Sequence, residues 1–379
     1  MNRSNLIGLN RTAMRAFFAE LGEKAFRTDQ LLKWVHQAGA TRFDDMTNLS
    51  KALRARLDSV ATIAPLDVRQ EQIARDGTRK WLLGVDDRNS VEMVFIPEDD
   101  RGTLCVSSQV GCALNCSFCS TAQQGFNRNL TTAEIIGQLW LANRLLPPRT
   151  GDDPRAVTNV VLMGMGEPLL NFDAVTDALD IMLDDFAYGL AKKRVTLSTA
   201  GVVPGIDRLA ERVPVSLAIS LHATNDALRD QLVPINRKYP IKTLMDACRR
   251  YAQKQSRQRI TFEYVMLDGV NDSAREARQL VSLLSDVPAK VNLIPFNPFP
   301  SARYARSKWS TIDRFRDIIS AKGITTITRR PRGDDIDAAC GQLVGAVQAR
   351  SANRRRHRAL VSTPSLVADA TAIDAQDQA

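Results

Sequence analysis

Three cysteines stand close together in one short stretch of the chain, at Cys112, Cys116 and Cys119, and an aromatic residue precedes the third. A structural zinc site has four protein ligands in a closed tetrahedron, and no fourth cysteine or histidine stands nearby. Three thiolates suit a four-iron cluster in which one iron has no protein ligand. Such an iron can chelate a small molecule through amine and carboxylate groups, so the spacing predicts a catalytic metal centre.

A second group of candidate residues follows segments that have the character of buried strands. Gly166 and Glu167 lie in a glycine-rich turn, where the missing Cβ allows a ligand to approach the backbone closely. Residues at the ends of later expected strands are Ser198, Ser220, Leu221, His222 and Asn297. Singly, each is more often a strand cap than a ligand; together they could line one pocket.

Two further cysteines and one glutamate are candidates for chemistry outside the metal centre. Cys105 stands on an expected strand seven residues before Cys112, and Cys340 lies near the end of the patterned part of the chain. Buried cysteines also behave as small apolar residues, which is the interpretation for Cys248. Glu92 interrupts an apolar strand, either as a surface residue or as a partly buried base with a raised pKa.

From about residue 103 onward, expected strands and helices alternate, which predicts an α/β fold with a parallel sheet and right-handed crossovers. The expected strands are 103–107, 157–163, 194–198, 215–221, 259–266, 290–295 and 325–329. The expected helices are 132–146, 172–186, 241–255, 274–285 and 312–321. Ligands bind at the carboxyl ends of such strands, where the candidate residues fall.

The flanking segments predict a multi-part chain. Residues 1–65 read as a small helical module and residues 66–101 as a short antiparallel β connector. The core then covers 102–347. Residues 348–379 begin with a basic run, Arg354 to Arg358, continue as a polar stretch and are expected to be a disordered tail.

Composition places limits on partners and compartment. The 379 residues carry a net charge of +9, which favours a polyanionic partner because basic side chains release counterions from phosphates. Clustered thiolates indicate a reducing compartment, and no signal-type segment or membrane-spanning apolar stretch is present. We therefore expect a cytoplasmic protein with no membrane partner. Candidates for phosphate contacts are Arg27, Lys33, Arg128, Arg229, Arg237, Lys238, Arg329, Arg330 and Arg332.

The motifs resemble those of a known superfamily. The cysteine spacing looks like the signature of the radical S-adenosylmethionine (SAM) enzymes, and Gly164 to Pro168 resembles their Gly-Gly-Glu-Pro motif. The segment around Cys340, with Cys105 and residues 117–130, looks closely like the RlmN/Cfr family of RNA methyltransferases. This resemblance extends from about Glu92 to Leu343, and more loosely into the helical module.

The resemblance implies a fold and a set of cofactors. The fold would be a partial (β/α)6 barrel with a helical N-terminal module. A [4Fe-4S] cluster would be held by Cys112, Cys116 and Cys119 and would bind SAM through its free iron. By resemblance, the residues that contact SAM are Gly166, Glu167, Ser198, Ser220, Leu221, His222 and Asn297.

The resemblance also implies a reaction. Carbon C2 of adenine is electron-poor, so an ordinary methyl transfer from SAM fails. In the family, Cys340 would take a methyl group from one SAM, and a 5′-deoxyadenosyl radical from a second SAM would remove a hydrogen from it. Glu92 would accept the C2 proton, and Cys105 would release the product by forming a transient disulfide with Cys340.

The implied product is 2-methyladenosine at adenine 2503 of 23S rRNA, in the peptidyl transferase centre, and at adenine 37 of tRNA, beside the anticodon. A flavodoxin-type electron donor and a monomeric state are further expectations. Two alternatives remain open: a Cfr-type enzyme that methylates C8 of the rRNA adenine, and an RNA-binding module with a structural zinc ion.

Overall fold

A mixed sheet of ten strands organises most of the chain. The computed structural model describes residues 3–149, 154–255 and 259–348. Within them the strands are ordered β14-β13-β12-β11-β10-β9-β6-β5-β4-β3. The expected tail, with its basic run, lies outside the described residues except for Gln348. No helix in the described ranges is both long and apolar enough to cross a membrane.

The strands from β6 to β14 pair in parallel and form the barrel part of the sheet. They are β6 (Gly102–Cys105), β9 (Asn159–Leu162), β10 (Val195–Thr199), β11 (Ser216–Ser220), β12 (Ile260–Met266), β13 (Ala289–Pro295) and β14 (Thr325–Thr328). Each corresponds to a strand expected from the sequence. Among the described strands β14 pairs only with β13, so the barrel stays open and the prediction of a partial barrel is confirmed.

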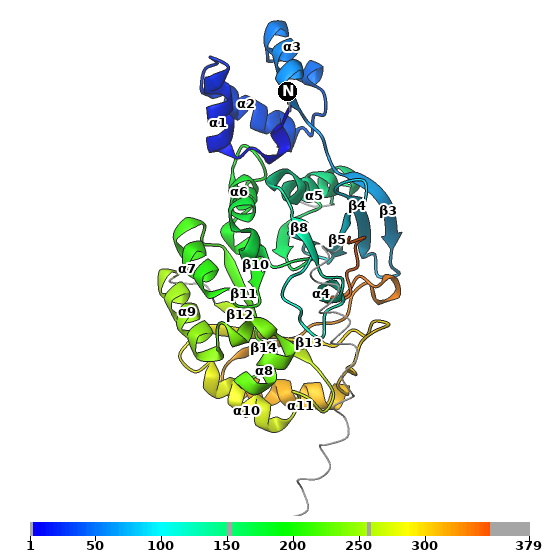
Figure 1. The fold of residues 1–379 in the computed structure, drawn as a ribbon, viewed down its shortest axis with the longest axis vertical. Helices are drawn as coiled ribbons and strands as arrows, with labels where there is room; N and C mark the ends of the chain where they lie inside the picture. Colours follow the sequence, from blue (N-terminus) through cyan, green and yellow to red (C-terminus); the bar gives the residue numbers. More distant parts are fainter. Residues whose placement is uncertain (1–2, 150–153, 256–258, 349–379) are drawn as a thin grey trace, which may run out of the picture.

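Helices cover the outer face of the curved sheet (Figure 1). They are α5 (Thr132–Leu145), α6 (Phe172–Leu183), α7 (Val203–Arg212), α8 (Asp226–Leu232), α9 (Ile241–Lys254), α10 (Ala274–Leu283) and α11 (Trp309–Ser320). The sequence reading missed α7 and α8. Pro204 and Gly205 suggest a turn, but proline fits the first turn of a helix because its missing N–H has no partner there anyway.

The expected β connector continues the core sheet. Strands β3 (Asp67–Ile73), β4 (Arg79–Gly84) and β5 (Ser90–Pro97) pair antiparallel with one another, and β5 pairs antiparallel with β6. Residues of β5 therefore lie directly beside the first barrel strand. This placement brings Glu92 into the interior, where its side chain is only 6% exposed.

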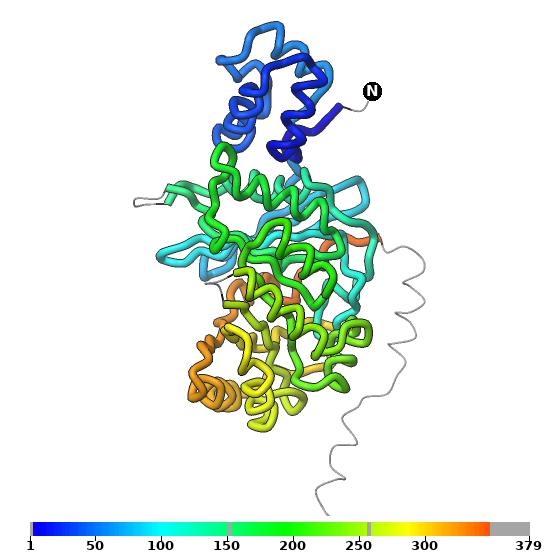
Figure 2. The backbone as a smooth tube through the Cα atoms, turned by 90° about the vertical axis from the view of Figure 1, so that its left-hand side faces the viewer, coloured from blue at the N-terminus to red at the C-terminus, as the bar shows by residue number. Residues whose placement is uncertain are grey.

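The N-terminal helical module packs on the outside of the barrel (Figures 1 and 2). It contains α1 (Arg11–Glu20), α2 (Phe26–Leu32), the π-helical turn Lys33–Gln37, the 3-10 turns Leu6–Gly8 and Phe43–Asp45, and α3 (Lys51–Val60). The short strands β1 (Ser4–Asn5) and β2 (Ala61–Thr62) pair and join its two ends. Its buried residues include Met14, Phe18, Leu31 and Leu57.

Close packing fixes this module to α5 of the barrel. The Trp140 indole N–H donates to the carbonyl oxygen of Val35 at 2.7 Å. A Cβ added at Gly8 would lie 2.6 Å from the backbone nitrogen of Ala133. The contact therefore has no room for a side chain at residue 8.

Replacing Gly8 with valine should disturb this contact. The added carbons have no space, and overpacking of this kind costs about 1–3 kcal/mol. We expect the Gly8→Val protein to unfold at a lower urea concentration and to be cut faster by protease between the module and the barrel. Ala16→Val, at an exposed position of α1, is the control. Equal stability and protease resistance of the two variants would contradict this packing.

Candidate active site

One cavity of about 160 Å³ lies at the carboxyl ends of the barrel strands and brings most of the candidate residues together. It is lined by Cys112, Cys116, Cys119, Gly166, Glu167, Ser198, Ser220, His222, Asn297 and Cys340, among others. These residues come from separate parts of the chain, and only the parallel barrel places them side by side. The rule that ligands bind at the carboxyl ends of parallel strands holds here.

The three clustered cysteines lie in a loop that a small hairpin holds at the mouth of the barrel. Strands β7 (Gln109–Gly111) and β8 (Phe126–Asn129) pair antiparallel on either side of the loop. The backbone N–H of Cys112 donates to Gly125 O at 2.8 Å, and that of Cys119 donates to Cys116 O at 3.2 Å. The loop therefore presents its cysteines to the cavity on a backbone with its own hydrogen bonds.

The chemistry of this donor set fits an iron–sulfur cluster. Desolvation raises the pKa of all three thiols, that of Cys112 to about 12, so they become thiolates only when positive charge is bound beside them. Within the described residues, no three or more His, Cys, Asp or Glu side chains converge as ligands of one ion would. In a four-iron cluster each cysteine binds a different iron, so its sulfurs need not converge on one point.

The glycine-rich turn faces this loop across the cavity. Gly166 has a φ of +100°, and an added Cβ would lie 2.5 Å from Cβ of Gln109. The carboxylate of Glu167 accepts backbone N–H groups from Leu169 at 3.1 Å and from Ala200 at 2.8 Å. Burial raises the pKa of Glu167 to about 7 despite these bonds. The turn thus presents a fixed, buried carboxyl group to any ligand that carries a donor.

The residues at the end of β11 and just after it differ in whether their side chains line the cavity. His222 has a φ of +60°, and its Nδ1 accepts the Val265 N–H at 3.0 Å, which leaves Nε2 as the ring donor. Burial lowers the pKa of His222 to about 3, so the ring is neutral. The side chain of Leu221 packs in the hydrophobic core and does not line the cavity, unlike those of Ser220 and His222.

Arg229 has a structural position, and its assignment as a candidate for phosphate contact is wrong. Its side chain is 0% exposed. The guanidinium donates to the carbonyl oxygens of Leu221, Ala200 and Ser220 and to the side chain of Asn236, at 2.7–3.0 Å. These bonds fix the ends of β10 and β11, where the cavity-lining residues stand. Arg128 is likewise engaged, in a two-pronged contact with Glu134.

Cys340 is carried by the segment 333–348, which crosses the mouth of the barrel. Apart from one 3-10 turn at Asp334–Ile336, this segment forms no helix or strand. Hydrogen bonds from three sides hold it: Ser120 N to Gly341 O at 2.7 Å, Ser90 N to Ala346 O at 2.9 Å, and Asn297 Nδ2 to Cys340 O at 3.3 Å. A Cβ at Gly345 would lie 2.1 Å from Ser90 O, so the segment passes in close contact with β5.

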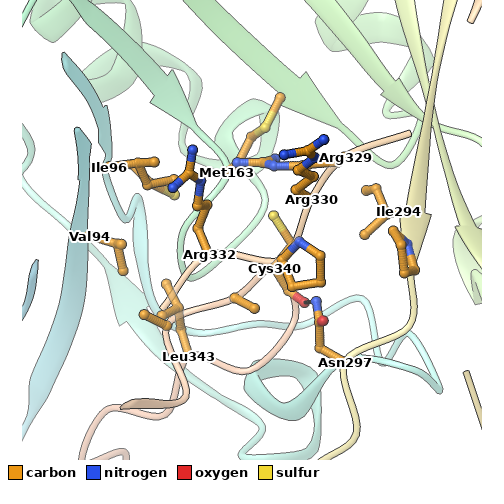
Figure 3. Close-up of a pocket in the computed structure, with 15 residues that line it drawn as sticks. Val94, Ile96, Met163, Ile294, Asn297, Arg329, Arg330, Arg332, Cys340 and Leu343 are labelled. Carbon is orange, nitrogen blue, oxygen red and sulfur yellow. Dashed lines mark hydrogen bonds between the residues drawn. The ribbon is translucent and has the colours of Figure 1, made fainter. Parts of the chain in front are cut away.

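A narrow crevice of about 30 Å³ lies on the other side of Cys340 and also reaches Cys105. Figure 3 shows Cys340 between Asn297 and the side chains of Arg329 and Arg330. Burial raises the pKa of the Cys105 thiol to about 12. All six cysteines are free, so the expected Cys105–Cys340 disulfide is not formed in this structure. Cys340 therefore lines both the cavity and the crevice, as Asn297 and Arg329 also do.

Glu92 approaches the same segment from β5. One carboxylate oxygen accepts the Val344 N–H at 2.8 Å, and the other lies 3.2 Å from Nζ of Lys80. Burial raises the pKa of Glu92, and the cation of Lys80 opposes that rise. Of the two interpretations offered by the sequence, the structure supports the partly buried carboxylate.

Sequence reasoning missed two charged side chains of this site. Glu263, from the middle of β12, lines the cavity, and its buried Oε2 has no hydrogen-bond partner among the described residues. Lys80 is buried beside Glu92 on the neighbouring strand. A charged residue inside a largely apolar strand is the sequence signal for such side chains, and the sequence prediction applied it only to Glu92. Arg329 was singled out as a candidate for RNA contact, but it also lines the cavity beside Cys340.

Comparisons with known proteins agree with this geometry. Residues 4–63 match the family model of the ribosomal RNA large subunit methyltransferase N-terminal domain, and residues 106–281 match that of the radical SAM superfamily. A crystal structure of a radical SAM methyltransferase from Sphaerobacter thermophilus is 44% identical, covering 90% of this chain and 99% of that one, with a TM-score of 0.83. A domain of pyruvate-formate lyase-activating enzyme from Bacteroides vulgatus is 15% identical with a TM-score of 0.35, covering 45% of this chain and 99% of that one, which is too distant to support an argument.

The barrel, the cysteine loop and these matches define a radical SAM methyltransferase, whose cofactors are a [4Fe-4S] cluster and SAM. More narrowly, the N-terminal match and the 44% identity over nearly the whole length place the chain in the RlmN family. The structural zinc alternative is therefore excluded.

Replacing the buried Arg229 should destabilise the whole protein. Arg229→Met leaves three carbonyl groups and Asn236 without their donor, and removal of a buried, fully bonded charge costs roughly 3–5 kcal/mol. We expect this loss in urea unfolding, whereas Arg208→Met, whose side chain is 60% exposed, should change little. Equal stability of the two variants would show that Arg229 does not fix the strand ends.

Proposed function

We propose that this protein methylates carbon C2 of adenine in 23S rRNA and in tRNA, with Cys340 as the carrier of the methyl group. The observation that carries the proposal is the position of Cys340, which lines both the cavity that contains the clustered cysteines and the crevice that contains Cys105. A methyl carrier must meet a methyl donor on one side and pass the carbon to the substrate. Residues 4–63, which match an rRNA methyltransferase domain, support an RNA substrate.

Cys340 is proposed to act first as a nucleophile. Its sulfur attacks the methyl carbon of one SAM and displaces S-adenosylhomocysteine, and the product is S-methylcysteine at residue 340. The thiol proton is lost in this step, and Arg329 is the cation that lines both the cavity and the crevice beside the sulfur.

The iron–sulfur cluster would supply the electron transfer that the amino-acid side chains of the site cannot provide. Cys112, Cys116 and Cys119 would hold the cluster, which would supply one electron for cleavage of a second SAM; the fragment so formed would remove a hydrogen atom from the methyl on Cys340. Gly166, Glu167, Ser198, Ser220, Leu221, His222 and Asn297 are proposed to bind SAM. Leu221 can do so only through its backbone, because its side chain is in the core.

Glu92 and Cys105 are proposed to complete the reaction once the carbon is bonded to adenine. Glu92 accepts the proton from C2, for which it must be ionised. Cys105 then attacks the Cys340 sulfur as a thiolate, so that a disulfide forms and the carbon–sulfur bond breaks. The carbon stays on the RNA and takes up a proton to become the methyl group, and the remaining unpaired electron would return to the cluster. Cys105 must lose its proton first, and its high pKa keeps it a neutral thiol until that stage. External thiols return the disulfide to the free cysteines seen in this structure.

The RNA is proposed to reach Cys340 from the arginine side of the crevice. Arg329, Arg330 and Arg332 line it, and arginine suits phosphate oxygens because of its planar, two-pronged donor set. The target base must leave its stack to meet Cys340. Residues 1–65 are proposed to be an accessory RNA-binding module, 66–101 the β connector and 102–347 the catalytic core. The electron donor is proposed to be flavodoxin-like, and the protein a cytoplasmic monomer.

Mass spectrometry of digested RNA tests this function. Unmodified rRNA or tRNA is incubated anaerobically with the cluster-loaded protein, SAM and reductant. We expect 2-methyladenosine from the native protein and none from Cys340→Ala, because the carrier sulfur is missing. The colour of the cluster and cleavage of SAM should persist in that variant.

Other products would redirect the assignment. 8-Methyladenosine would place the protein in the C8 branch of the family. The absence of any methylated adenosine, with SAM cleaved by an intact cluster, would overturn the proposed substrate.

A further inference from the structure

A buried ion pair connects the two central antiparallel strands beside Cys340. Lys80 on β4 and Glu92 on β5 are 7% and 6% exposed, and Nζ of Lys80 lies 3.2 Å from Oε1 of Glu92. Removing both charges from water costs several kcal/mol per ion, which close contact and further hydrogen bonds must offset. A hydrophobic pair would stabilise this sheet at least as well. The pair therefore calls for an explanation in terms of function.

Both members of the pair also hold the segment that carries Cys340. Nζ of Lys80 lies 3.3 Å from the carbonyl oxygen of Asp337, to which it donates. Oε2 of Glu92 accepts the Val344 N–H at 2.8 Å. These contacts fall three residues before and four residues after Cys340. The ion pair thus holds the carboxylate of Glu92 against this segment. Other hydrogen bonds hold the segment independently of the pair, so Cys340 does not depend on Lys80 for its position.

The charges around Glu92 are few. Burial among apolar side chains favours the protonated form, and the carboxylate of Asp337 acts in the same direction. Lys80 is the cation that opposes both. The backbone N–H of Val344 adds a smaller effect that favours the ionised form. Without Lys80, the balance at neutral pH would move toward the neutral acid, which cannot accept a proton.

We propose that Lys80 is a positioning residue for proton removal: it keeps Glu92 ionised and holds its carboxylate against the segment that carries Cys340. This inference rests on the proposed function, because it takes Glu92 as the proton acceptor. It predicts that Lys80 matters for the late half of the reaction only. Methylation of Cys340 needs no base at Glu92 and should proceed without Lys80.

The test compares Lys80→Met with Lys80→Arg, and with Lys192→Met as an exposed control. Two quantities are measured for each protein: methyl incorporation into the Cys340 peptide, and the pH dependence of methyladenosine formation in a single turnover. For Lys80→Met we expect normal methylation of Cys340. We expect the acidic limb of the pH profile of methyladenosine formation to move to higher pH by about one unit or more, because an adjacent cation shifts a carboxyl pKa by this amount.

The sign follows from the charge that is removed. Loss of the cation raises the pKa of Glu92, so the base is lost over a pH range in which the native protein keeps it, and it returns as the pH is raised. Lys80→Arg keeps the charge and should keep the acidic limb near its native position. In a Glu92→Gln background, Lys80→Met should have no further effect on the rate, because the group on which it acts is gone.

Two results would overturn the inference. One is an unchanged pH profile in Lys80→Met; the other is an equal fall of Cys340 methylation and RNA methylation, which would mark a purely structural role. If Lys80→Met does not fold, Lys80→Gln, which retains a hydrogen-bond donor, is judged by the same two readouts. Failure of the proposed function is distinguishable, because the native protein would then form no methyladenosine at any pH.

Discussion

The site depends on how a segment without helix or strand hydrogen bonding is held across the mouth of the barrel. Residues 337–348 contain no regular secondary structure, yet they carry Cys340. Backbone groups of this segment bond to the cysteine loop, to β5 and to the loop after β13. Each partner also belongs to another functional part: the loop holds the cluster, β5 carries Glu92, and Asn297 lines the cavity. The segment that carries the sulfur is therefore held by the same parts of the fold that carry the other proposed site residues.

Several charged side chains are buried in this part of the fold, and each is stabilised by different partners. The guanidinium of Arg229 donates to carbonyl oxygens and so fixes the ends of two strands. Glu167 is bonded by two backbone N–H groups and still has a pKa near 7, because burial outweighs those bonds. Glu92 has a cation beside it. Such groups cost stability, so their concentration near the carboxyl ends of the strands and the Cys340 segment is typical of a site selected for chemistry.

The sequence predicted the local features and missed those that depend on long-range contacts. Strand and helix alternation located the barrel, and cysteine spacing located the metal loop, because both patterns lie within short windows. Helix α7 was missed because Pro204 and Gly205 resemble a turn. Arg229 was misread because a lone arginine in a sequence usually indicates a surface, and only the folded chain brings four acceptors around it. Lys80 was overlooked because its partner belongs to the neighbouring strand and its second contact lies 257 residues away.

The central claim is that Cys340, and no other cysteine, receives the methyl group. The protein is loaded with its cluster, incubated with SAM carrying an isotopically labelled methyl group, digested and examined by peptide mass spectrometry. The account predicts one labelled methyl on the Cys340 peptide and none on the peptide that contains Cys105, whose thiol is held neutral by burial. Label on Cys105, or no label on any cysteine of a protein with an intact cluster, would contradict the account.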